Sequence, residues 1–292
     1  MESVAPVRQR LQVFAALAAL YFIWGSTYLA MRFAIEGFPP LMMAGIRFVV
    51  AGGLFVAFLR LRGMRLPNFE QWRSAASTGG LLLLGGNGAV AVAEQWIGSG
   101  VAALSIATVP LWTVLFARLW GQRSSRREWL GILLGFSGVG LLAFGGNMRA
   151  SPLGAMLLLF AAASWSFGSV WSKRLPMPPG LMSSAAQMLA GGVLLMGASL
   201  LFGEHMVAVP SAKAATALVY LIVFGSFVAF TSYQFLLHNV RPALATSYAY
   251  VNPVVALLFG WTFAGEHVGG VEWLAMAVIT GAVVMVVIGK AN

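Results

Sequence analysis

Aromatic side chains recur in this chain beside hydroxyl and amide side chains, at helical spacing and inside long apolar segments. Trp24 and Thr27 share one helical face, as do Trp165 and Ser169. The other residues of this kind are Ser105, Thr108 and Trp112 on one stripe, Tyr248 and Asn252 on another, and Asn87 and Tyr233. Aromatic faces with a few hydrogen-bonding groups suit a mostly apolar pocket that orients an amphipathic solute. We expect these residues to bind a solute, although packing or a place at the membrane interface is the simpler alternative for any one of them.

Arg47 is the one charge that falls in the middle of an apolar segment. An ionisable group at membrane depth is a functional candidate, either for contact with a solute or for gating. The alternative is structural, in which the guanidinium reaches the interface or bonds to carbonyls of a neighbouring helix. The sequence leaves both possibilities open.

The residue types give little support to enzyme chemistry. The chain has no cysteine and every acidic residue is a glutamate, which excludes thiolate chemistry, disulfides and aspartate-based proteolysis. The three histidines fall at the ends of apolar segments, away from any facing serine. No metal-ligand cluster, glycine-rich phosphate loop or basic nucleic-acid stripe stands out. We therefore expect no enzyme activity, cofactor, metal or nucleic acid.

Composition places the chain in a membrane. Of its 292 residues, 60% are hydrophobic and only 9% are charged, and the mean hydropathy is +0.85. So few charges could not cover the surface of a water-soluble protein of this length, so lipid must solvate it.

Apolar windows of about 20 residues recur along the whole chain. They predict an all-α polytopic membrane protein with ten transmembrane helices, at residues 11–32, 41–59, 73–92, 101–119, 129–144, 152–171, 181–202, 214–237, 243–263 and 271–288. The connections are short, which leaves no room for a soluble domain.

Basic residues predict the orientation. With the N-terminus in the cytoplasm, most Lys and Arg fall in the cytoplasmic loops, and only Arg32, Arg149 and Lys213 fall outside. The outer turns carry glutamates instead, at Glu36, Glu94, Glu204, Glu266 and Glu272. We expect both termini in the cytoplasm.

The sequence pattern around Pro110 is repeated around Pro253. In each copy a proline inside an apolar segment is followed by a turn and then by Glu-Trp-Leu, at 128–130 and at 272–274. Proline kinks a long helix because its nitrogen cannot donate a hydrogen bond. We expect Pro110 and Pro253, together with Arg47, to serve gating.

The charges of the two copies are opposite. The turn before Glu128 is rich in arginine, whereas its counterpart before Glu272 carries Glu266 and no Lys or Arg. Halves with five spans each must insert with opposite orientation, and the charge reversal agrees with this. The sequence therefore predicts two inverted five-helix repeats, residues 1–148 and 149–292, that form one transport domain.

With these features the chain resembles the drug/metabolite transporter superfamily, in its EamA-type branch, and within it the YddG-type amino acid exporters. The residues that carry the resemblance are Trp24-Gly25-Ser26, Arg47, Pro110, Pro253-Val254 and Gly265-Glu266. The resemblance implies that the first four helices of each half surround a central cavity, with the fifth of each half at the periphery. In the first half an arginine-rich turn replaces Gly-Glu, which weakens the case for a role of that glutamate.

We therefore expect an inner-membrane transporter that exports small metabolites, with aromatic or hydrophobic amino acids favoured, by alternating access. Its partners would be the solute and membrane lipids, and a monomer is expected. No carboxylate falls at mid-depth and only Glu94 comes close, which favours movement without tight proton coupling. The alternatives are a proton-coupled exporter of drugs or other amphipathic solutes, a sugar-phosphate exchanger and, outside transport, a membrane scaffold.

Overall fold

The computed structural model describes residues 7–121, 125–145, 151–240 and 248–289, and these form helices joined by turns. The prediction of an all-α chain is confirmed for this part of the protein. The start of the predicted ninth span, at Ala243, lies outside the described residues, as do Arg123, Arg149, Arg241 and Lys290.

Among the described residues, the first half contains five helical segments, which we call rods, and three of them combine α-helix with π-helix, 3₁₀-helix or a break. The elements are α1 (Val7–Ala19), the π-helix η1 (Leu20–Trp24) and α2 (Gly25–Ala34); α3 (Pro40–Leu61); α4 (Phe69–Gly79), the π-helix η2 (Gly80–Gly88) and α5 (Ala89–Ala93); α6 (Ser99–Ile106), α7 (Val109–Ala117) and the 3₁₀ turn η3 (Arg118–Trp120); and α8 (Arg126–Gly145). The π-helical stretches were not predicted. A wider π turn breaks the usual bonding pattern and often occurs at functional sites.

The second half repeats this plan with fewer interruptions. Its elements are α9 (Pro152–Ser172), α10 (Leu181–Leu201), α11 (Ala212–Tyr220), the π-helix η5 (Leu221–Val228), α12 (Ala229–Asn239), α14 (Tyr248–Ala264) and α15 (Gly270–Gly289). The π-helices η2 and η5 lie in the third helical rod of their respective halves.

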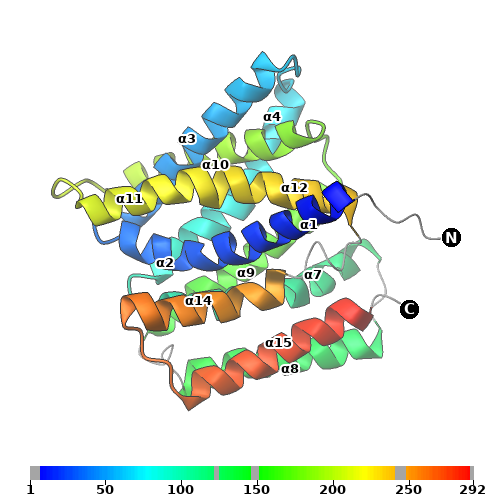
Figure 1. The fold of residues 1–292 in the computed structure, drawn as a ribbon, viewed down its shortest axis with the longest axis vertical. Coiled ribbons are helices and arrows are strands. Elements are labelled where there is room, and N and C mark those ends of the chain that lie inside the picture. The colour runs from blue at the N-terminus through cyan, green and yellow to red at the C-terminus, as the bar shows by residue number, and fades with distance from the viewer. Residues whose placement is uncertain (1–6, 122–124, 146–150, 241–247, 290–292) are drawn as a thin grey trace.

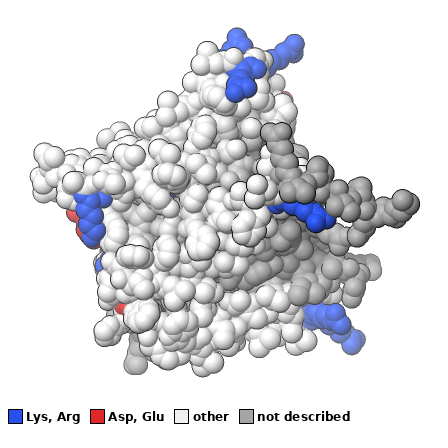
Figure 2. Space-filling view, in the orientation of Figure 1, with Lys and Arg blue, Asp and Glu red and all other residues white. Residues whose placement is uncertain are grey.

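Length and hydropathy mark the chain as a multi-pass membrane protein. In the described residues seven helical segments are long and apolar enough to cross a membrane, and two shorter apolar helices follow at Val251–Ala264 and Gly270–Met285. The count of ten spans stays a prediction. The uncharged face in Figure 2 fits this assignment, because Lys and Arg lie at its margins.

Equivalent helices of the two halves pack against one another. The most extensive pairings are α3 with α10 and α15 with α8, which lie at opposite edges of the bundle (Figure 1). Between these edges, α14 packs on α6, η2 on α9, and α12 on α1. Exchanging the halves turns each of these pairings into one that is also present, so the packing has an approximate twofold relation.

Two reciprocal glycine contacts hold α3 against α10. A Cβ atom built on Gly52 would lie 2.3 Å from the backbone nitrogen of Leu189, and one built on Gly192 would lie 2.5 Å from that of Val49. Only glycine permits this approach of two backbones, which dispersion contacts stabilise in lipid. We call this contact the α3–α10 seam.

The repeated Glu-Trp-Leu motif begins a helix in each half. Glu128 Oε2 accepts a hydrogen bond from the Ser125 backbone nitrogen at 2.6 Å, and Glu272 Oε2 accepts one from the Gly269 nitrogen at 2.9 Å. Each carboxylate thus satisfies an N–H group just before α8 or α15, where the helix dipole favours negative charge. The motif that revealed the repeat is structural.

Candidate functional site

The helical bundle has two ends. Figure 1 shows that α1 begins and α15 ends on the same side, which we call the terminal end. The opposite side, where α2 ends and α15 begins, is the distal end.

Four aromatic rings from three helices meet within the bundle. The centroid of the Trp24 ring lies 4.9 Å from that of Tyr248, 5.5 Å from that of Tyr233 and 5.6 Å from that of Phe230. Tyr233 and Tyr248 are themselves in edge contact, with centroids 5.7 Å apart. Three of the predicted site residues, Trp24, Tyr233 and Tyr248, are thereby brought together. We call the four rings the Trp24 cluster.

The π-helix η5 holds this cluster in place. The indole nitrogen of Trp24 donates a hydrogen bond to the backbone oxygen of Gly225 at 3.2 Å. The counterpart in the other half is η2, where the Ser164 hydroxyl donates to the Leu81 oxygen at 2.7 Å. A π turn changes the register of backbone bonding, and in both places a side chain from the first helix of the other half bonds a carbonyl within it.

Arg47 links α3 to the same π-helix. Its side chain is buried, its Nε donates to the Ser226 hydroxyl at 3.0 Å, and its guanidinium lies 4.6 Å from the centroid of the Phe48 ring. Thr27 and the Arg47 guanidinium both lie close against Gly225. These contacts cross-link helices of the two halves, which fits the structural alternative for Arg47 and leaves its role in gating a prediction.

Most of the predicted hydroxyl residues bond their own helix. Thr27 donates to the Trp24 oxygen, Ser105 to that of Val101, Thr108 to that of Ser105, and Ser169 to that of Trp165. Such bonds to the preceding turn satisfy a hydroxyl without any ligand. Asn252 differs, because it is buried and its Oδ1 has no hydrogen-bond partner. Asn87 is partly buried in η2.

Trp112 belongs to a second aromatic group. Its ring lies 4.9 Å from that of Phe136 and 5.9 Å from that of Phe116, centroid to centroid, and Phe116 in turn contacts Phe167 at 5.4 Å. The indole nitrogen of Trp112 is buried without a hydrogen-bond partner. Trp165 packs elsewhere, against Gly86 of η2. The predicted site residues therefore divide among different neighbourhoods.

The two prolines act differently on their helices. At Pro110 the helical rod is divided, since α6 ends at Ile106 and α7 begins at Val109. Pro253 instead lies inside α14, which continues from Tyr248 to Ala264. The Ser166 hydroxyl donates to the Val109 oxygen at 2.9 Å, next to the break.

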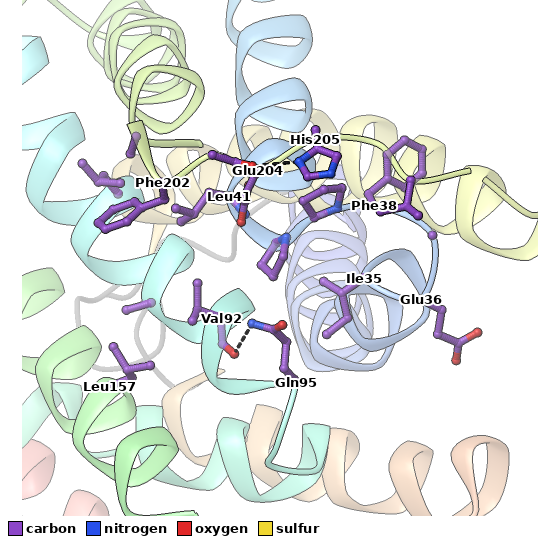
Figure 3. A pocket seen from close by; sticks show the side chains of 18 of the residues that line it. Ile35, Glu36, Phe38, Leu41, Val92, Gln95, Leu157, Phe202, Glu204 and His205 are labelled. Carbon is purple, nitrogen blue, oxygen red and sulfur yellow. Dashed lines mark hydrogen bonds between the residues drawn. The ribbon is translucent and has the colours of Figure 1, made fainter. Parts of the chain in front are cut away.

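A cleft of about 1230 Å³ opens at the distal end. Figure 3 shows Gln95 bonded to the Val92 carbonyl on one wall and Phe202, Glu204 and His205 on another. Gly80 and Ser164 also line the cleft. None of the predicted site residues lines it, so the Trp24 cluster and the cleft are separate features.

Glu266 closes the distal end on a different side of the bundle. Its Oε1 accepts hydrogen bonds from the Ser99 nitrogen at 2.6 Å and the Ser99 hydroxyl at 2.8 Å, and its Oε2 accepts one from the Gly100 nitrogen at 3.0 Å. The carboxylate thus caps the start of α6 from the loop between α14 and α15. Its first-half counterpart is missing, which in the sequence weakened the case for a role of Glu266. Its position after a Gly was the only signal.

The features above define the class of protein: a multi-pass membrane protein built from two equivalent helical halves. The chain belongs to the EamA-like transporter family, whose model matches residues 11–144 and again residues 152–288. The double match confirms the two-repeat architecture.

The relatives are transporters by name. The chain is 52% identical over 284 residues to "Uncharacterized inner membrane transporter YedA" of Escherichia coli (strain K12), covering 97% of this chain and 93% of that protein. It is 26% identical over 265 residues to "Uncharacterized transporter YdfC" of Bacillus subtilis (strain 168), covering 89% and 85%. A solved crystal structure, 22% identical, shares the fold with a TM-score of 0.66 over 99% of this chain and 100% of that one.

Proposed function

We propose that the protein is a bacterial inner-membrane transporter that exports small metabolites by alternating access. The location follows the name of the relative from Escherichia coli. Ten spans in two inverted repeats, residues 1–148 and 149–292, with both termini in the cytoplasm, complete the proposal. The terminal end is then cytoplasmic and the distal end faces outward.

The packing of the helices supports alternating access. Two groups of helices lie between the α3–α10 and α8–α15 pairs: the α14 group (α1–α2, α11–α12 and α14) and the α9 group (α4–α5, α6–α7 and α9). At the distal end α6 of the α9 group packs on α14 and α2. Towards the terminal end, among the described residues, α7 packs on α9, α8 and α15 and makes no comparable contact with α1, α12 or α14. This one-sided contact is the observation that carries the proposal, because a carrier must join its two groups at one end at a time.

The Trp24 cluster supports an amphipathic cargo. Its rings offer flat apolar faces, and the hydroxyls of Tyr233 and Tyr248 add hydrogen-bonding groups from α12 and α14. Aromatic or hydrophobic amino acids fit such a surface, and they are the cargo that the resemblance to the YddG-type exporters implies. The spans described here carry no mid-depth carboxylate, which favours movement down the solute gradient over tight proton coupling and over export of cationic drugs.

Flux from liposomes tests the proposal. Purified protein should release a labelled aromatic or hydrophobic amino acid from sealed vesicles. Trp24→Ala should lower that flux up to about tenfold, because it removes one aromatic contact with the solute, worth about 0.5–1.5 kcal/mol. The same change removes the three ring contacts that position Phe230, Tyr233 and Tyr248. Trp261→Ala is the matched control, since Trp261 lies on α14 with 59% of its surface exposed.

Unchanged flux in both Trp24→Ala and Trp165→Ala would refute the solute site. Absence of flux for every amino acid, with none bound in detergent, would favour a scaffold.

A further inference from the structure

Glu94, at the distal end, is a buried carboxyl group without a donor. It follows α5 directly, has no exposed surface, and neither of its carboxylate oxygens has a hydrogen-bond partner. The other glutamates near this end are satisfied: Glu266 caps α6, Glu204 accepts from the backbone nitrogens of α3, and Glu36 pairs with Lys213 at 2.8 Å. Native proteins seldom bury an unpaired ionised carboxylate, because its desolvation costs several kcal/mol.

The charged neighbours of Glu94 do not neutralise it. Arg32 of α2 donates a hydrogen bond to the backbone oxygen of Glu94, not to its carboxylate. Glu266, from the α14–α15 loop, adds a second negative charge nearby. Tyr28 of α2 lies within electrostatic reach of both Glu94 and Arg47 of α3. The other elements packed on α5, which are α9 and η2, have no titratable side chain.

These surroundings favour the neutral acid. Burial raises the pKa of Glu94 well above its ordinary value, the charge of Glu266 raises it further, and Arg32 lowers it by a smaller amount. A protonated carboxyl also avoids placing two negative charges side by side at the closed end of the protein.

We propose that Glu94 is a proton-binding site of the distal gate, protonated while Arg32 of α2 and the Glu266 loop lie beside it, and ionised when these elements separate from α5. This inference rests on the proposed alternating-access function. Separation would admit water to the carboxylate and remove the Glu266 charge from its neighbourhood. The proton binds from, and returns to, the outer solution, so it biases the gate without being carried across the membrane.

The sign of the pH dependence follows from the higher pKa of the closed form. The closed gate is favoured in full below the ordinary carboxyl range, and it loses this advantage as the outer pH rises through the raised pKa. Within that window the ratio of open to closed gate should rise about tenfold per pH unit for a single proton.

Distance measurement by electron paramagnetic resonance tests the site. The chain has no cysteine, so spin labels can be placed by Gln95→Cys and Gly270→Cys, two exposed distal positions. In liposomes the wild-type background should gain a long-distance component as the outer pH rises. Glu94→Gln, which keeps the shape and mimics the protonated acid, should keep the short distance throughout. Glu36→Gln, an exposed carboxylate at the same end, should respond like the wild type.

A wild-type distance that does not change with pH, or a Glu94→Gln protein that titrates like the wild type, would overturn the proposal. Glu94→Asp is a second variant, should Glu94→Gln fail to fold, and it should still titrate. Amino acid flux measured in the same vesicles separates the two hypotheses. Flux with pH-independent distances refutes only the proton site, whereas pH-dependent distances without any flux refute the proposed cargo transport and leave the proton site standing.

Discussion

Single hydrogen bonds between side chains and neighbouring helices hold the two halves together, and the bond between Arg47 and Ser226 involves a charged donor. Arg47 is only 4% exposed, and Ser226 supplies an acceptor at 3.0 Å from its Nε. Water has little access to this position to replace a lost partner. The net value of such a bond is therefore better measured by removing the acceptor than by removing the charge.

Ser226→Ala should lower the free energy of unfolding by about 1–3 kcal/mol, because it leaves a buried charged donor with one partner fewer. Thr231→Val is the control, since Thr231 is exposed and bonds only the Phe227 oxygen of its own helix. That change should stay within about 0.5 kcal/mol. Thermal melting of both proteins in detergent measures the difference, and equal melting temperatures would show that Ser226 does not support Arg47.

The sequence predicted which residue types would lie in the interior, but not which of them would meet. Trp24, Tyr233 and Tyr248 are in contact, and their role in binding a solute stays a prediction. Thr27 and Ser105 bond the preceding turn, an arrangement open to any helical hydroxyl and therefore invisible in the spacing. Trp112 lies in another group because its partner Phe136 comes from α8, and sequence alone does not give that packing.

At the scale of helices, the α3–α10 seam depends on the absence of a side chain. Gly52→Ala would place a Cβ 2.3 Å from the Leu189 nitrogen, so the helices must separate, at a cost of about 1–3 kcal/mol. Gly53→Ala is the matched control, because nothing lies within 4 Å of its added Cβ and alanine favours a helix by about 1 kcal/mol. We expect the melting temperature to fall for the first variant and to stay level or rise for the second. The opposite order would mean that the seam is not closely packed in the membrane.

The ends of helices could be predicted where the amino-acid composition changes. Changes from α-helix to π-helix within a segment could not. The predicted second span, residues 41–59, falls inside α3, because a proline pair begins that helix and basic residues end it. The π-helices η2 and η5 have no comparable pattern in the sequence. The wider turn of a π-helix is stabilised by contacts from another helix, such as the bond from Trp24 to Gly225, and local sequence does not show such contacts. Equal kinks were expected at the two prolines, yet only Pro110 lies at a division between helices.

For the whole molecule, the orientation in the membrane can be tested by labelling. Single cysteines at Gln95 and Gly270 should react with an impermeant maleimide in intact cells, because the distal end faces outward in the proposed topology. Cysteines at Arg65 and Lys173, on the terminal side, should react only after permeabilisation. If the two sets reacted alike, or with the sides exchanged, the cytoplasmic location of both termini would be wrong.

The two-repeat architecture could be predicted because both halves of the sequence carry its signals. These are the proline inside an apolar segment, the Glu-Trp-Leu motif and the loop charges, which are reversed between the halves. The end at which the two helix groups meet could not be predicted. It depends on contacts such as Glu266 with Ser99 and Gly100, which join residues more than 160 positions apart. In the proposed transport cycle the same sequence must be compatible with two forms, so it carries no local mark of the form described here.

The glycine contact between α3 and α10 has a mechanical consequence. Two backbones in direct contact have no flexible side chains between them to absorb sliding, so Gly52 and Gly192 fix the relative height of these helices. In the proposed alternating access, motion of the α14 and α9 groups would then be a rotation about this pair. Such a rotation would spread one mouth of the proposed solute path as it narrows the other, and would so prevent a continuous leak through the protein.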